Sequence, residues 1–155
     1  MRLHDGGDLQ EMAMENDLGE VIEQYQNSLA EFGKGDPEPT KKVWSHQEDV
    51  TLANPLGPPA CGWEQVEKTL ERASSAIRGG ESVDFETVAK YVTPELAYIV
   101  WIERVMAKLG AREDITPFAL RVTTIFRPEE GTWRIVHRHA DPITTAQPAE
   151  SVIQE

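Results

Sequence analysis

Two histidines and an aspartate near the C-terminus are spaced so that they could act on one ligand. Side chains of a β-strand alternate between its two faces, so His137, His139 and Asp141 fall on the same side of a predicted strand. Trp133 and Ile135 precede them on that side. A face that passes from large apolar side chains to imidazoles and a carboxylate is typical of a pocket wall, apolar at depth and polar where a ligand is oriented.

These residue types favour proton transfer. An imidazole that a carboxylate orients can remove a proton next to a carbonyl near neutral pH. In this scheme Arg121 or Tyr98 stabilises the enolate, and in a water-activating variant Asp49 or Glu103 is the base. The alternative is that the histidines only cap the sheet or orient a ligand. The candidate catalytic residues are His137, His139, Asp141 and Asp49.

A second set of residues is predicted to line the same pocket. Tyr98 and Glu103 have opposite parity on one strand, so both can face the pocket only if a bulge lies between them. His137 and His139 could also begin a metal site, but a third ligand of suitable geometry is needed, and we predict neither metal nor cofactor. The predicted ligand-binding residues are Trp44, His46, Asn54, Trp63, Tyr98, Glu103, Arg121 and Thr123.

The composition limits the classes of function. The 155 residues suit one domain, and 39% of them are hydrophobic, which is enough for a core. A net charge of -12 argues against binding to nucleic acid or to an anionic membrane. No apolar run is long enough for a membrane span, no signal sequence is recognisable, and the single cysteine, Cys61, agrees with a reducing compartment. The predicted location is the cytoplasm.

Hydrophobic periodicity predicts the order helix, helix, strand, helix, followed by four strands. Residues 1–16 are polar and acidic and are predicted to be a flexible tail. Apolar residues then recur every three or four positions from Leu18 to Phe32, which indicates a first helix. Asp36 and Pro37 can begin a short second helix that runs to about Ser45. The third helix is predicted from Trp63 to Ile77, with Gly79 and Gly80 ending it.

The remaining segments read as strands joined by turns. Asn54 to Pro59 is a loop, because its prolines lack the N–H groups that a sheet requires. Helices placed before a strand meander indicate an α+β fold in which a curved antiparallel sheet wraps around the N-terminal helices. The domain is predicted at 17–142, with a C-terminal tail at 143–155. The strands are predicted at 49–53, 83–92, 96–107, 118–127 and 132–140.

Several motifs in residues 17–142 resemble the SnoaL-like, or ketosteroid isomerase-like, branch of the nuclear transport factor 2-like superfamily. They are Phe32-Gly33-Lys34-Gly35-Asp36, Trp44-Ser45-His46, Asn54-Pro55-Leu56-Gly57 and Gly131-Thr132-Trp133-Arg134-Ile135-Val136-His137-Arg138-His139. The resemblance implies a cone-shaped α+β barrel with a small-molecule pocket, commonly in a homodimer. Val122, Phe126 and Val136, expected on the outer side of the last strands, agree with a dimer formed through the sheet.

The resemblance leaves several functions open. Asn54 stands where ketosteroid isomerases carry an aspartate base, so steroid isomerisation by that route is not expected. Scytalone dehydratase and related lyases use a histidine with a carboxylate, a pair that His137 or His139 could form with Asp141, Asp49 or Glu103. The predicted function is a cofactor-independent isomerase, cyclase or dehydratase that acts on a carbonyl compound. The alternative is a non-catalytic ligand-binding or dimerising association module.

Overall fold

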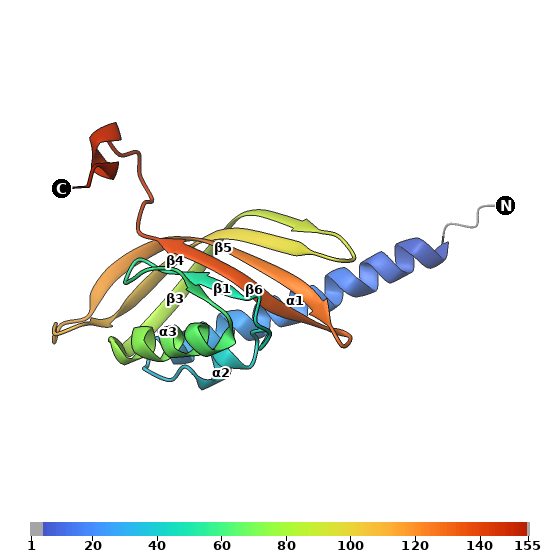
Figure 1. Ribbon diagram of the computed structural model, residues 1–155, viewed down its shortest axis with the longest axis horizontal. Coiled ribbons are helices and arrows are strands. Elements are labelled where there is room, and N and C mark those ends of the chain that lie inside the picture. Colours follow the sequence, from blue (N-terminus) through green and yellow to red (C-terminus); the bar gives the residue numbers. More distant parts are fainter. Residues whose placement is uncertain (1–4, 155) are drawn as a thin grey trace.

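The computed structural model describes residues 5–154 and shows helices packed against the concave side of one curved sheet (Figure 1). The predicted order of helix, helix, strand, helix and four long strands is confirmed, and a two-residue strand is added after the first strand. The helices are α1 (Asp5–Phe32), α2 (Glu38–Lys41) and α3 (Trp63–Ser75), with a short 3-10 helix, η1 (Ala149–Val152), near the C-terminus. The strands are β1 (Thr51–Ala53), β2 (Ala60–Cys61), β3 (Ile77–Val92), β4 (Ala97–Leu109), β5 (Thr116–Glu129) and β6 (Thr132–Asp141).

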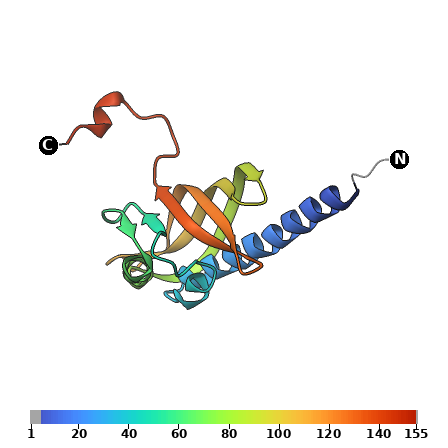
Figure 2. The same ribbon diagram turned by 45° about the vertical axis from the view of Figure 1, so that its right-hand side comes forward.

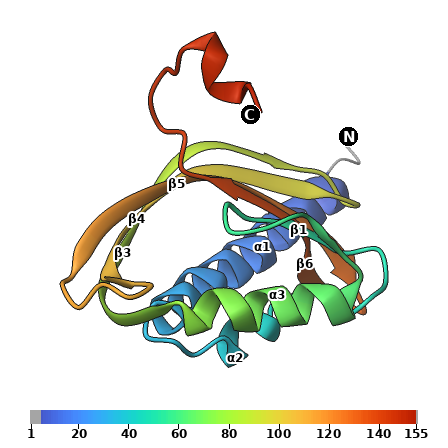
Figure 3. The ribbon, with the colours of Figure 1, turned by 60° about the vertical axis from the view of Figure 1, so that its left-hand side comes forward.

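The sheet has six strands in the order β2-β1-β6-β5-β4-β3. Strands β3 to β6 form an antiparallel meander, whereas β1 pairs with β6 in parallel and with β2 in antiparallel orientation. Figure 3 shows that the sheet curves over α1 and α3 without closing into a complete barrel. The predicted α+β fold is therefore confirmed, with the β1–β6 pair as the parallel exception.

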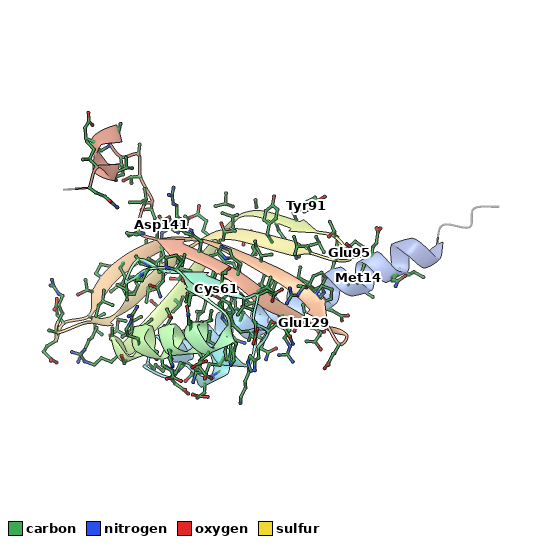
Figure 4. The ribbon with its side chains drawn as sticks, viewed as in Figure 1. Met14, Cys61, Tyr91, Glu95, Glu129 and Asp141 are labelled. Atoms are coloured by element: carbon green, nitrogen blue, oxygen red, sulfur yellow. The ribbon has the colours of Figure 1, made fainter. Side chains whose placement is uncertain are left out.

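Helix α1 is longer than the sequence pattern predicts. The helix begins at Asp5, so the prediction that residues 5–16 form a tail before the first helix was wrong. Residues 1–4 of the predicted tail lie outside the described residues. Tertiary contacts hold this N-terminal part of the helix. The Trp133 indole N–H donates a hydrogen bond of 3.2 Å to the Met14 carbonyl, and Met14 packs against the core. Figure 2 shows the N-terminal part of α1 extending past the sheet, and Figure 4 marks Met14 near that point.

The end of α3 also differs from the prediction. The helix ends at Ser75 and strand β3 already begins at Ile77, so the two glycines predicted to terminate the helix belong to the strand. Gly79 has φ +62°, and the β3–β4 register shifts at this point. A Cβ on Gly80 would lie 2.9 Å from the backbone of Gly33, and the Gly80 N–H donates to the Gly33 carbonyl. These glycines let β3 pass close to the end of α1, a role that local sequence does not distinguish from a helix cap.

The core fills the space between α1, α3 and the sheet. The apolar face predicted for the first helix is buried, with Tyr25 fully enclosed. On β5 the outward positions are taken by Arg121 and Thr123, so Val122 and Phe126 point inward and are buried. Their expected place on the outer side of the sheet was therefore wrong.

The chain leaves the sheet after β6. Residues 143–154 contain only η1 and extend away from the body of the molecule (Figure 1). Among residues 5–154, no helix combines the length and the apolar character needed to cross a membrane.

Candidate functional site

A β-bulge in β6 decides which side chains face the interior. Phe126 of β5 pairs with Ile135, but its neighbour Ile125 pairs with His137, so Val136 is an extra residue in β6. An extra residue reverses the alternation of faces along the rest of a strand. Trp133 and Ile135 point inward before the bulge, and Arg138 and Ala140 point inward after it.

The prediction that the two histidines continue the face of Trp133 and Ile135 was therefore wrong. His137, His139 and Asp141 lie on the opposite, outer side of the sheet, and Arg138 takes the inward position. Figure 4 marks Asp141 where the C-terminal segment leaves the sheet. The bulge cannot be read from β6 alone, because it is defined by pairing with β5.

Arg138 and Glu103 form a buried ion pair at the centre of the interior. Arg138 Nη1 donates to Glu103 Oε1 at 2.7 Å, and Nη2 donates to Oε2 at 2.9 Å. Only 11% of the Arg138 side chain and 4% of the Glu103 side chain are exposed. Two parallel hydrogen bonds fix both the distance and the orientation of the two charged groups.

Two aromatic side chains complete this polar cluster. The Trp101 indole N–H donates to Glu103 Oε1 at 3.0 Å, and the Tyr25 hydroxyl accepts from Arg138 Nη1 at 2.7 Å. The rings of Tyr25 and Trp101 stack with centroids 5.9 Å apart. Burial raises the pKa of Tyr25 to about 12, although the Arg138 charge opposes it. Tyr25 therefore remains a neutral phenol at physiological pH.

The cluster faces a cavity with two parts. A deep part of about 80 Å³ includes Tyr25, Glu103 and Arg138 in its lining, and an outer part of about 290 Å³ reaches the loop that contains Asn54. Both parts share Arg138 and a set of apolar residues from α1, α3, β3 and β5. The shared apolar residues are Phe32, Leu70, Ile77, Phe118 and Leu120.

The interior contains two of the predicted ligand-binding residues. Glu103 faces the deep cavity, and Asn54 lines the outer cavity, where its Oδ1 accepts a hydrogen bond from the Leu56 N–H. Tyr98 has the parity opposite to Glu103, as predicted, and is exposed on the outer side, stacked on Tyr91 with ring centroids 5.7 Å apart. Sequence reasoning missed Arg138 and Tyr25. Tyr25 had a usable signal, since a tyrosine within an apolar helix face places a hydroxyl inside the domain.

A second group lies in an open groove on the outer side of the sheet, lined by Arg121, Thr123, His137, His139 and Asp141. Of the two histidines, His139 contacts Asp141 here, and its Nε2 donates to Asp141 Oδ2 at 3.2 Å. Arg121 Nε also donates to both oxygens of Asp141. Burial disfavours ionisation of Asp141, but the hydrogen bonds from Arg121 and the Ile143 N–H outweigh it and lower its pKa.

A third group lies around the loop before β1. Trp44 and His46 line an open surface groove, and His46 Nε2 donates to the Lys41 carbonyl at 3.0 Å. His46 stacks on Trp63 with ring centroids 3.9 Å apart. Asp49 pairs with Arg127, whose hydrogen bonds lower the Asp49 pKa. The twelve predicted residues therefore lie in separate places rather than around one pocket.

The partial burial of His137 leads us to expect that the stability of the protein depends on pH. Burial, with a smaller contribution from His139, lowers the pKa of His137 below its ordinary value of 6.5. The unfolded chain consequently binds a proton at this histidine more readily than the folded chain does. The stabilisation that neutral His137 contributes is therefore fully present above pH 6.5 and is lost as the pH falls from 6.5 toward the folded-state pKa. We expect the free energy of unfolding of His137→Asn to fall less steeply than that of the wild type between pH 7 and 5 in urea titrations. Equal slopes would contradict this assignment.

Comparison with known proteins supports the architecture. The model of the SnoaL-like domain matches residues 21–144. The chain belongs to the SnoaL-like family. A comparison of this chain with curated protein sequences finds no match.

Solved structures of low sequence identity share the fold of this SnoaL-like domain. A nuclear transport factor 2-like superfamily protein from Salmonella enterica is 18% identical over 90% of this chain and 97% of its own, with a TM-score of 0.71. A ketosteroid isomerase-like protein from Erwinia carotovora atroseptica is 15% identical over 82% and 94%, with a TM-score of 0.68. A candidate calcium/calmodulin-dependent protein kinase type II association domain from Thiobacillus denitrificans is 18% identical over 80% and 93%, with a TM-score of 0.66. These names span different activities, so the likeness indicates a fold and not a reaction.

Proposed function

We propose that this SnoaL-like domain binds a small, mainly apolar organic molecule in the interior cavity, with a polar end of the ligand against Arg138. The observation that carries the proposal is the position of Arg138. Its three hydrogen bonds to Glu103 and Tyr25 use three of its five N–H groups. Within residues 5–154 the other two have no partner, and Arg138 lines both parts of the cavity.

The walls of the cavity support an apolar ligand body. The lining of the outer cavity is apolar apart from Asn54 and Arg138, and its volume of about 290 Å³ suits a molecule of one or two rings. Burying such a ligand body contributes binding free energy in proportion to its apolar area, while the guanidinium N–H groups orient its polar end.

Catalysis is the second candidate, and Tyr25 is the observation that favours it. A neutral phenol held by Arg138 can donate a hydrogen bond to a carbonyl oxygen and so stabilise an enolate, as an isomerase, cyclase or dehydratase requires. The histidine base predicted from sequence lies on the other side of the sheet. Within the cavity lining the base would have to be Glu103, whose oxygens already accept three hydrogen bonds. Binding is therefore the better-supported function.

Calorimetric titration with 2-acetylnaphthalene tests the proposal. We expect saturable binding to the wild type and a loss of at least about tenfold in affinity for Ala73→Phe, which fills the outer cavity, since steric exclusion of the ring removes its apolar contacts. Glu113→Gln is the matched control, because Glu113 is exposed on the β4–β5 connection and should bind as the wild type does. Equal affinity in Ala73→Phe would contradict binding in the cavity. Consumption of carbonyl probes by the wild type but not by Tyr25→Phe would favour the catalytic candidate.

We also propose that the domain forms a homodimer through the outer side of the sheet. Tyr91 and Tyr98 are 58% and 38% exposed there and form a stacked pair, and Val100 and Ile125 extend the apolar surface toward the groove. Figure 4 marks Tyr91 on the β3–β4 hairpin. Sedimentation velocity should show a dimer at micromolar concentration and a monomer for Tyr98→Glu, because a buried unpaired charge opposes association. A monomeric wild type would contradict this proposal.

A further inference from the structure

The charge of Arg138 is already balanced inside the cavity. Arg138 and Glu103 are the charged side chains among the residues that line the two parts, and their charged groups are in direct contact at 2.7 and 2.9 Å. The polar end of the cavity therefore carries no net charge, although it contains an arginine.

Glu103 is held so that it cannot turn away from Arg138. Its Oε1 accepts from the Trp101 indole as well as from Arg138. Trp101 is fully buried, and its ring centroid lies 4.8 Å from that of Phe85 and 5.9 Å from that of Tyr25. Glu103 lines the deep part of the cavity and Arg138 lines both parts. Because the packed indole fixes the carboxylate, the polar end of a ligand that reaches Arg138 also lies close to Glu103.

This arrangement separates neutral from anionic ligands. A carboxylate ligand would leave water and approach Glu103 as well as Arg138, so repulsion from Glu103 offsets the attraction to Arg138. A ketone, ester or similar neutral acceptor can accept from the remaining guanidinium N–H groups without bringing an unbalanced charge into the cavity.

We infer that Glu103 is the residue that determines ligand charge, so that the cavity accepts neutral hydrogen-bond acceptors and rejects organic anions of the same shape. This inference rests on the proposed binding function. It assigns to Glu103 a role in specificity, in place of the role as a base that its residue type suggests.

The first experiment uses the wild-type protein and two probes of similar shape, neutral 2-acetylnaphthalene and anionic 2-naphthoate. At pH 7 we expect the ketone to bind at least about tenfold more tightly, because naphthoate, like other carboxylic acids with a pKa of about 4, is ionised. As the pH falls from 7 to 5.5, the apparent affinity for naphthoate should rise about tenfold per unit, since only its protonated form is accepted, while that for the ketone stays constant.

The second experiment reverses the preference. In Glu103→Gln the side-chain shape is kept but Arg138 is left with a net positive charge, so naphthoate should bind more tightly than the ketone at pH 7. Glu113→Gln is the control for a general change in charge and should keep the wild-type preference. If Glu103→Gln does not fold, Glu103→Met makes the same test, because it also removes the carboxylate and keeps the length of the side chain, and an unchanged wild-type preference in it would overturn the inference.

The outcomes separate this inference from the proposed function. If naphthoate binds the wild type as tightly as the ketone at pH 7, without dependence on pH, the role of Glu103 is wrong while cavity binding stands. If neither probe binds, or if both bind Ala73→Phe as well as the wild type, the proposed function fails and the inference with it. The expected preference, its pH dependence and its reversal in Glu103→Gln together establish the role of Glu103.

Discussion

Replacing Arg138 by methionine should lower the free energy of unfolding by about 3–5 kcal/mol, because it leaves the Glu103 carboxylate buried without its counter-charge. Glu103 is 3% exposed as a residue and would keep only the Trp101 N–H as a donor among its present partners. Since small domains are stable by only about 5–15 kcal/mol, this loss is a large part of the total. Urea denaturation followed by far-ultraviolet circular dichroism measures it.

The double variant Arg138→Met with Glu103→Leu is the control. It removes both charges and keeps side chains of similar bulk, and replacement of a buried ion pair by apolar residues is often neutral or stabilising. We therefore expect the double variant to recover most of the stability that the single variant loses. If the two variants are equally unstable, the loss comes from packing and not from the unpaired carboxylate.

Replacing Trp101 by alanine has an effect of similar size, with an expected loss of about 3–5 kcal/mol. Trp101 is fully buried between Tyr25 and Phe85 and carries the N–H that holds Glu103. Removal of the ring opens a cavity in the core and also withdraws a hydrogen bond from a buried carboxylate. The same urea titration measures this loss.

Trp101→Phe separates these two contributions. It keeps an aromatic ring in the core but has no indole N–H, so a smaller loss of about 1–3 kcal/mol is expected. Trp44→Phe is a matched control for the change in ring size, because Trp44 is also buried and its Nε1 has no hydrogen-bond partner among the described residues. If Trp101→Phe is no more destabilised than Trp44→Phe, the hydrogen bond to Glu103 contributes little.

Local pattern was sufficient to predict the three α-helices, the first strand and the four long strands. Apolar residues at helical spacing from Leu18 to Phe32 predicted the buried face of α1, and runs rich in β-branched residues predicted the four long strands. Boundaries were less predictable where a distant contact decides them. Helix α1 extends back to Asp5 past the contact between Met14 and Trp133, and Gly80 belongs to β3 because that strand passes close to Gly33.

In the candidate site, too, local sequence predicted some features and contacts between strands decided others. Strand alternation predicted correctly that His137, His139 and Asp141 share a face, and that Tyr98 and Glu103 do not. It could not predict which face is the interior, because the bulge at Val136 exists only in the pairing of β6 with β5.

The sequence by itself determined the α+β class, the order of the elements and the SnoaL-like resemblance, since these depend on residue types and spacings that each segment carries locally. Only the tertiary structure decided that Arg138, Glu103 and Tyr25 meet at the cavity while the histidines lie outside it. The physical reason is that one extra residue in β6 reverses every side chain after it, and its position is set by pairing between strands rather than by the residues of β6 alone.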